Sequence, residues 1–155
     1  MTNMPSSQGA EPRPLIPALA KLYPCAAVWG YVLLRVTAGL MLIPHVWPKL
    51  MAGPSAIAAN VMVRRGVEPA LLAAWIAIVL ECVGVVCITL GLFTRAVAVL
   101  LVIEFLVIVK AHSVAGWGAN MQGAEFPFLW LVVLIVILLR GGGPLSLDRK
   151  LGWEI

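Results

Sequence analysis

Charged side chains are scarce in this sequence. Only 12% of the 155 residues are Asp, Glu, Lys or Arg, about half of the ~25% share that is typical of a soluble domain. Apolar residues make up 62% of the chain. This balance excludes a water-soluble fold, and we expect no separate soluble catalytic domain once the membrane spans are subtracted from the length.

Cysteine is also rare. The three cysteines, Cys25, Cys82 and Cys87, form neither a CxxC pair nor a metal-ligand spacing, and we interpret them as small apolar filler. No paired thiol, haem motif or flavin loop indicates an electron carrier. The net charge of +4 is not gathered into a basic stripe, which excludes nucleic acid as a partner.

The apolar residues form long runs that predict four membrane-spanning helices, because one span uses ~20 of them. The predicted spans cover residues 26–43, 70–92, 96–114 and 127–139. The last run has only 13 residues and reaches about 20 Å at 1.5 Å per residue, which is short of the ~30 Å hydrocarbon core. It must therefore borrow length from residues 123–126 or 141–143.

Prolines mark the segments outside these spans. Residues 1–24 carry five prolines and predict an extended tail before a membrane domain over residues 25–155. Pro44, Pro48 and Pro54 predict a broken or interfacial segment directly after the first helix. The expected fold is all-α, a four-transmembrane-helix bundle with that broken segment. Six Lys and Arg residues against four favour a cytoplasmic position for both termini.

Three charged residues stand in the middle of predicted spans, where an ionisable group is costly and rarely faces lipid. They are Arg35, Glu81 and Glu104. Because the centre of every span lies at the membrane midplane, we expect these side chains to meet, with the Arg35 guanidinium as the common partner of both carboxylates. Two roles stay open for them: ion pairing that only holds the helices together, or a proton or cofactor site.

A second polar set lies towards one end of the predicted bundle and comprises His45, Lys49, Lys110, His112 and Glu125. His45 and Lys49 share a helix face only if the helix continues through Pro48. Because histidine titrates near neutral pH and can hold a polar head group, His45, His112 and Glu125 predict a quinone or small-molecule pocket. The alternative is a set of interfacial residues satisfied by water and lipid head groups. Their spacing predicts no metal site.

Three strings of the sequence carry a resemblance to a known family: LLRVTAGLMLIPHVWPKLMAG, ECVGVVCITLGLFTRAVAVL and LLRGGGPLSLD. In order and spacing they resemble the DoxX family of small four-helix membrane proteins, over residues 33–151. The motif positions are Arg35, His45, Lys49, Glu81, the GLFTR turn, His112, Glu125 and the closing GGPLSLD. Glu104 and the N-terminal tail are not part of the family pattern.

The resemblance implies a bacterial or archaeal inner-membrane protein linked to redox chemistry, and we expect the bacterial inner membrane. Relatives occur as membrane subunits of thiosulfate:quinone oxidoreductase and in assemblies that handle thiol or oxidative stress, so the family does not specify one reaction. One hypothesis is therefore a redox subunit on the quinone or sulfur/thiol side, with quinone as a non-covalent cofactor and the electrons supplied by a partner protein.

The other hypothesis is a non-catalytic subunit that assembles with a larger membrane complex, so the sequence leaves open whether the chain is part of an enzyme. A pocket lined by His45, His112 and Glu125 would favour the redox subunit. A solid interior with contacts from the tail to another chain would favour assembly. A small proton-coupled carrier is disfavoured because the sequence has no repeat symmetry.

Overall fold

The protein is helical throughout the part that the structure describes. This computed structural model describes residues 15–118 and 123–152, and no strand occurs among them. The longer helices are α1 (Tyr23–Met41), α2 (Ile43–Ala52), α4 (Ala70–Leu90), α5 (Thr94–Ser113) and α6 (Glu125–Arg140). The short segments are η1 (Pro17–Lys21), α3 (Pro54–Ile57), η2 (Ala58–Met62), η3 (Val63–Arg65) and α7 (Leu147–Leu151). The predicted all-α class is confirmed.

Three helical stretches are long and apolar enough to cross a membrane. They are Tyr23–Ala52, which consists of α1 and α2 together, and the helices α4 and α5. α6 has 16 residues and is about 24 Å long, shorter than the ~30 Å hydrocarbon core. The helix begins at Glu125, two residues before the predicted start. Its last residue is Arg140, and it is followed by Gly141, whose φ of 72° is left-handed. A fourth crossing therefore stays a prediction.

The helix after α1 continues through two prolines. Pro44 lies in the first turn of α2 and Pro48 in its interior, and the Val46 N–H donates to the Leu42 carbonyl across the junction with α1 at 2.9 Å. Each proline removes only one donor, and the remaining bonds hold the helix together. The predicted broken segment is therefore wrong in its position. The chain breaks later, at Gly53 with φ of 80°, and α3, η2 and η3 follow.

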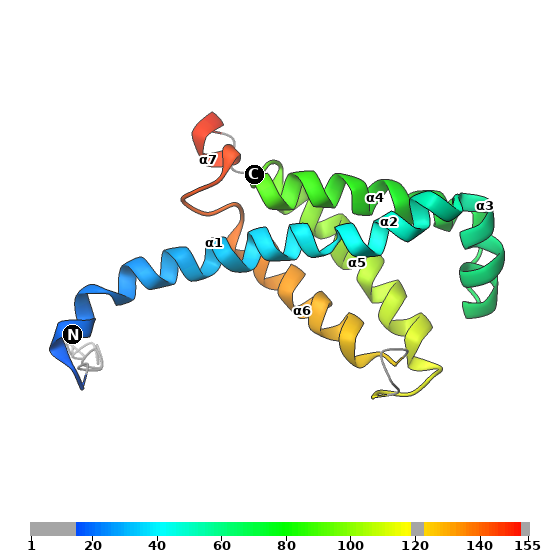
Figure 1. Ribbon diagram of the computed structural model, residues 1–155, viewed down its shortest axis with the longest axis horizontal. Coiled ribbons are helices and arrows are strands. Elements are labelled where there is room, and N and C mark those ends of the chain that lie inside the picture. The colour runs from blue at the N-terminus through cyan, green and yellow to red at the C-terminus, as the bar shows by residue number, and fades with distance from the viewer. Residues whose placement is uncertain (1–14, 119–122, 153–155) are drawn as a thin grey trace, which may run out of the picture.

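Helix α4 is central to the packing. It contacts α1, α2 and α5, while α5 packs along α6, and Figure 1 shows the α5–α6 pair running obliquely to the other three helices. Glycine allows the closest approach, because a Cβ at Gly39 would lie 2.6 Å from the backbone nitrogen of Thr89. The apolar core between these helices consists of Ala38, Leu42, Ile88, Val97, Ala98, Leu101, Phe105, Leu131, Leu134 and Ile137.

The N-terminal part of α1 extends beyond the other helices (Figure 1). Residues 21–30 are exposed except for the half-buried Val28, and Tyr31 is the first buried side chain. The joined helix Tyr23–Ala52 has 30 residues and is about 45 Å long, about 15 Å more than the hydrocarbon core. Residues 1–14 of the predicted tail lie outside the described residues, while Pro17–Lys21 is a 3-10 helix rather than an extended chain.

Candidate functional site

A buried ion pair joins α2 to α4. Lys49 Nζ lies 2.5 Å from Glu81 Oε1, and only 3% of the Glu81 side chain and 24% of the Lys49 side chain are exposed. The two residues meet because α2 stays helical through Pro48 and packs against α4. Since little water reaches them, the desolvated carboxylate depends on the ammonium group for compensation. Lys49 thus pairs with a carboxylate from the middle of α4.

The charges of both Glu81 and Lys49 act on the carboxyl group of Glu104, which lies in the middle of α5. Both carboxylate oxygens of Glu104 are buried and have no hydrogen-bond partner in the described part of the chain, and the same holds for Glu81 Oε2. We call Lys49, Glu81 and Glu104 the interior cluster. It combines two carboxyl groups with one amine in an apolar surrounding and leaves three carboxyl oxygens able to accept a proton.

Arg35 belongs to a different site. Its side chain is only 1% exposed, and its guanidinium donates to the carbonyls of Ile88 at 2.7 Å, Thr89 at 2.9 Å and Leu145 at 2.8 Å. The first two carbonyls belong to the last turn of α4, where helix geometry leaves carbonyls without a partner in the helix. Arg35 therefore ties the end of α4 to the segment between α6 and α7.

The expectation that Arg35 pairs with Glu81 and Glu104 is wrong. The expectation placed Arg35 in the middle of a span because it took the first helix to end near Pro44, whereas the helix continues to Ala52. The centre of the bundle is consequently shifted along the chain from Arg35 towards Lys49, which lies 14 residues later, or about 21 Å along a helix.

The C-terminal segment is hydrogen-bonded to the end of the bundle at which Arg35 lies. The Asp148 carboxylate accepts hydrogen bonds from the backbone N–H of Phe93 at 2.6 Å and of Thr94 at 2.9 Å, and from the Thr94 hydroxyl at 2.7 Å. Gly91 is left-handed, with φ of 68°, and a Cβ there would lie 2.7 Å from Arg35 Nη1. Asp148 and Thr94 were not predicted as site residues, and their only sequence signal is their place in GLFTR and GGPLSLD.

The two histidines contact groups other than the carboxylates of the interior cluster. His45 lies one turn before Lys49 on the same face of α2, because the helix continues through Pro48. His45 is exposed, and its ring centroid lies 6.0 Å from that of Phe126 and 6.1 Å from that of Trp130. His112 is half-buried, and its Nδ1 lies 2.8 Å from the carbonyl one turn before it in α5. Neither histidine lines the pocket to which Glu125 contributes. The predicted set of two histidines and Glu125 therefore does not share that pocket.

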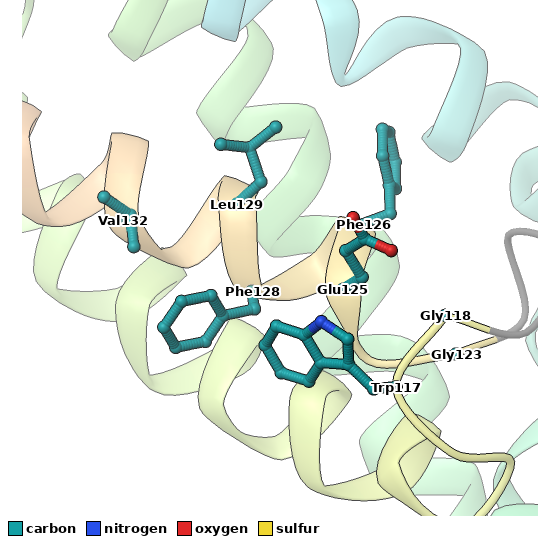
Figure 2. A pocket seen from close by; sticks show the side chains of 8 residues that line it. All are labelled: Trp117, Gly118, Gly123, Glu125, Phe126, Phe128, Leu129 and Val132. Carbon is teal, nitrogen blue, oxygen red and sulfur yellow. The ribbon is translucent and has the colours of Figure 1, made fainter.

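This pocket, of about 470 Å³, lies where α5 connects to α6. Figure 2 shows the rings of Trp117 and Phe128 side by side, with the carboxylate of Glu125 near them, and the two ring centroids are 5.3 Å apart. The lining residues are Trp117, Gly118, Gly123, Glu125, Phe126, Phe128, Leu129 and Val132. Among them Glu125 alone is charged. Aromatic walls with one polar group suit a flat, largely apolar ligand.

The comparison with known proteins identifies the family. The family model DoxX matches residues 30–114, which is more than half of the chain. The chain belongs to the DoxX family. No match was found among curated proteins or among solved structures. Together with the three apolar helices, DoxX membership makes this chain a multi-pass membrane protein.

The DoxX match divides the sites between two parts of the chain. Arg35, the interior cluster and both histidines lie within the matched residues, whereas the whole aromatic pocket and Asp148 lie beyond them. The exposed side chains of α4 and α5 are mostly apolar. Such a surface is unfavourable in water but favourable against the acyl chains of a bilayer, so it suits a lipid surrounding.

Proposed function

We propose that this DoxX protein is an integral membrane subunit of a redox system on the quinone side, and that it receives electrons from a partner protein with its own redox centre. The observation that carries the proposal is the aromatic pocket at the α5–α6 connection. A sulfur or thiol compound is the other substrate class of the family resemblance, but it would not use the flat aromatic walls of Trp117 and Phe128.

The residues of the pocket fit a quinone head group. Trp117, Phe126 and Phe128 offer ring faces for stacking or edge contacts, and the indole N–H of Trp117 is a donor that can hold a carbonyl oxygen. Glu125 at the start of α6 can hold a proton beside the same oxygen. When bound, a quinone supplies two-electron, two-proton chemistry, and this chain would contribute binding, orientation and proton-carrying groups.

The proposal places the chain in a bacterial inner membrane with both termini in the cytoplasm. The hydrogen bond from Asp148 N–H to the Gly91 carbonyl at 2.9 Å brings the α4–α5 turn and α7 to one end of the bundle. Basic residues are more numerous at that end, which supports the orientation through the positive-inside rule. In the described residues they are Lys21, Arg95, Arg140, Arg149 and Lys150, against Lys49, Arg64, Arg65 and Lys110 on the other side.

Quinone binding to the purified protein in lipid nanodiscs tests the proposal, with a short-chain ubiquinone as the probe and calorimetry as the readout. Loss of one aromatic contact is worth about 0.5–1.5 kcal/mol, so Trp117→Ala should raise Kd by about 2- to 10-fold. Trp29→Ala is a matched control, because Trp29 is 59% exposed and Trp117 58%. Equal Kd values for the two variants, or no binding by the native chain, would reject the quinone site.

A second candidate, a non-catalytic assembly subunit, is favoured by the N-terminal part of α1. This segment is apolar and exposed beyond the other helices, and such a surface is typical of protein contacts. Under this proposal, Trp29→Ala combined with Leu22→Ala removes a redox partner that co-purifies with the native chain in mild detergent. Retention of that partner by the double variant would contradict docking through α1, whatever the outcome for quinone.

A further inference from the structure

The interior cluster has more acidic than basic groups. Lys49 compensates Glu81 through Oε1, which leaves Glu104 without an ion-pair partner of its own and without a hydrogen bond to either oxygen within the described residues. A bare carboxylate that is removed from water without such partners is strongly unfavourable. Glu104 therefore needs either a bound cation or a proton.

No other charge in the described helices that pack around Glu104 can supply that compensation. Helix α4 carries only Glu81 between its ends, and α6 is apolar between its terminal charges, Glu125 and Arg140. Arg35 of α1 is bonded to carbonyls at the end of α4, and α3 and η2 have no charged residue. In α2 the other titratable residue besides Lys49 is His45, which is exposed. The remaining charged or titratable groups of α5 lie within its first two or last four residues: Arg95, Lys110 and His112.

We propose that Glu104 holds a proton inside the bundle and exchanges it with Glu81. In the exchange, the proton leaves the Glu104 carboxyl group and binds Oε2 of Glu81, the oxygen that Lys49 does not occupy. Glu104 becomes the carboxylate and Glu81 the neutral acid, while Lys49 keeps its charge. The total charge of the cluster is the same before and after, and the Lys49 ammonium, whose charge acts on Glu104 as well as on Glu81, then compensates the Glu104 carboxylate. The site is a proton-exchange site between α4 and α5.

This inference is independent of the quinone proposal, because it uses other residues in another part of the bundle. A bound metal is a poorer occupant than a proton, since no group of three or more His, Cys, Asp or Glu side chains comes together among the described residues. The sequence contributes one unusual feature to the site: Glu104 lies outside the motif residues that support the DoxX resemblance.

Infrared spectroscopy of the full chain in lipid nanodiscs tests the proton directly, through the carbonyl stretch of a protonated carboxyl group at neutral pH. We expect this band in the native protein and in Glu68→Gln, whose carboxyl group is exposed, and its loss in Glu104→Gln. Absence of the band from the native protein overturns the proposal without reference to any variant. Persistence of the band in Glu104→Gln also overturns it.

Transfer to Glu81 is tested by moving the same samples into D₂O and following the isotope shift of the band. If Glu81 is the exchange partner, the shift is slower than in the native protein in the double variant Glu81→Gln with Lys49→Met, which removes the partner without leaving the ammonium unpaired, whereas Glu68→Gln exchanges at the native rate. Equal rates in the native protein and the double variant overturn the transfer step. Thermal unfolding of each variant in the same nanodiscs confirms that the compared samples are folded.

Discussion

Removing Lys49 should reveal how strongly the interior cluster depends on its single cation. Lys49→Met deletes the ammonium group 2.5 Å from Glu81 Oε1 and leaves a carboxylate with 3% exposure in an apolar interior. Breaking a buried pair from one side costs about 3–5 kcal/mol. Because Lys49 is itself 24% exposed, we expect the lower end, about 3 kcal/mol, which is roughly a 100-fold change in the unfolding equilibrium.

Reversible denaturation in mixed detergent micelles measures this free energy of unfolding. Lys110→Met is the matched control, since Lys110 is exposed in α5 and such substitutions usually stay within about 0.5 kcal/mol. The double variant Lys49→Met with Glu81→Met should recover most of the loss, because well-packed apolar groups can replace a buried pair. If the two lysine variants were equally stable, or the double variant were as unstable as Lys49→Met, the stranded-charge explanation would be wrong.

Two further predictions concern the end of the bundle and the α1–α4 contact. Arg35→Leu removes three charged hydrogen bonds to backbone carbonyls, each worth about 1.5–3 kcal/mol, so it should destabilise the protein by several kcal/mol in the same assay; a loss as small as that of the exposed Arg64→Leu would contradict the assigned role. Gly39→Ala places a Cβ 2.6 Å from a backbone nitrogen and should cost about 1–3 kcal/mol. Gly30→Ala meets nothing within 4 Å and should stabilise the helix by up to about 1 kcal/mol; equal effects of the two glycine variants would disprove the close contact.

Local sequence features located the second and third helices well. The runs 70–92 and 96–114 correspond to α4 at Ala70–Leu90 and α5 at Thr94–Ser113, because hydropathy and the turn residues at Gly91 act over a few residues. The first helix was harder to delimit. Pro44 and Pro48 suggested a break, but a proline only removes one hydrogen bond, and packing of α2 against α4 compensates for that loss.

The candidate sites were harder to predict from the sequence than the helices, because tertiary contacts bring their residues together. The sequence alone identifies Glu81 and Glu104 as costly charges inside apolar helices, and both belong to the interior cluster. It does not identify their cation, because the choice between Arg35 and Lys49 depends on how far the first helix continues and which turn of it faces α4. Asp148 was missed for a similar reason, since its three hydrogen bonds go to residues more than 50 positions earlier.

Composition by itself determined that this chain is a helical membrane protein, because hydropathy is a sum over neighbouring residues and does not require knowledge of the fold. The motif strings determined the family, because they retain the order and spacing of its residues. Only the tertiary structure decided which charges meet. Ion pairing depends on distances of a few ångströms between helices, and these distances follow from helix length, rotation and the close contacts that Gly39 and Gly91 permit. Arg35 therefore forms hydrogen bonds at the end of the bundle, and Lys49 pairs with a carboxylate in its interior.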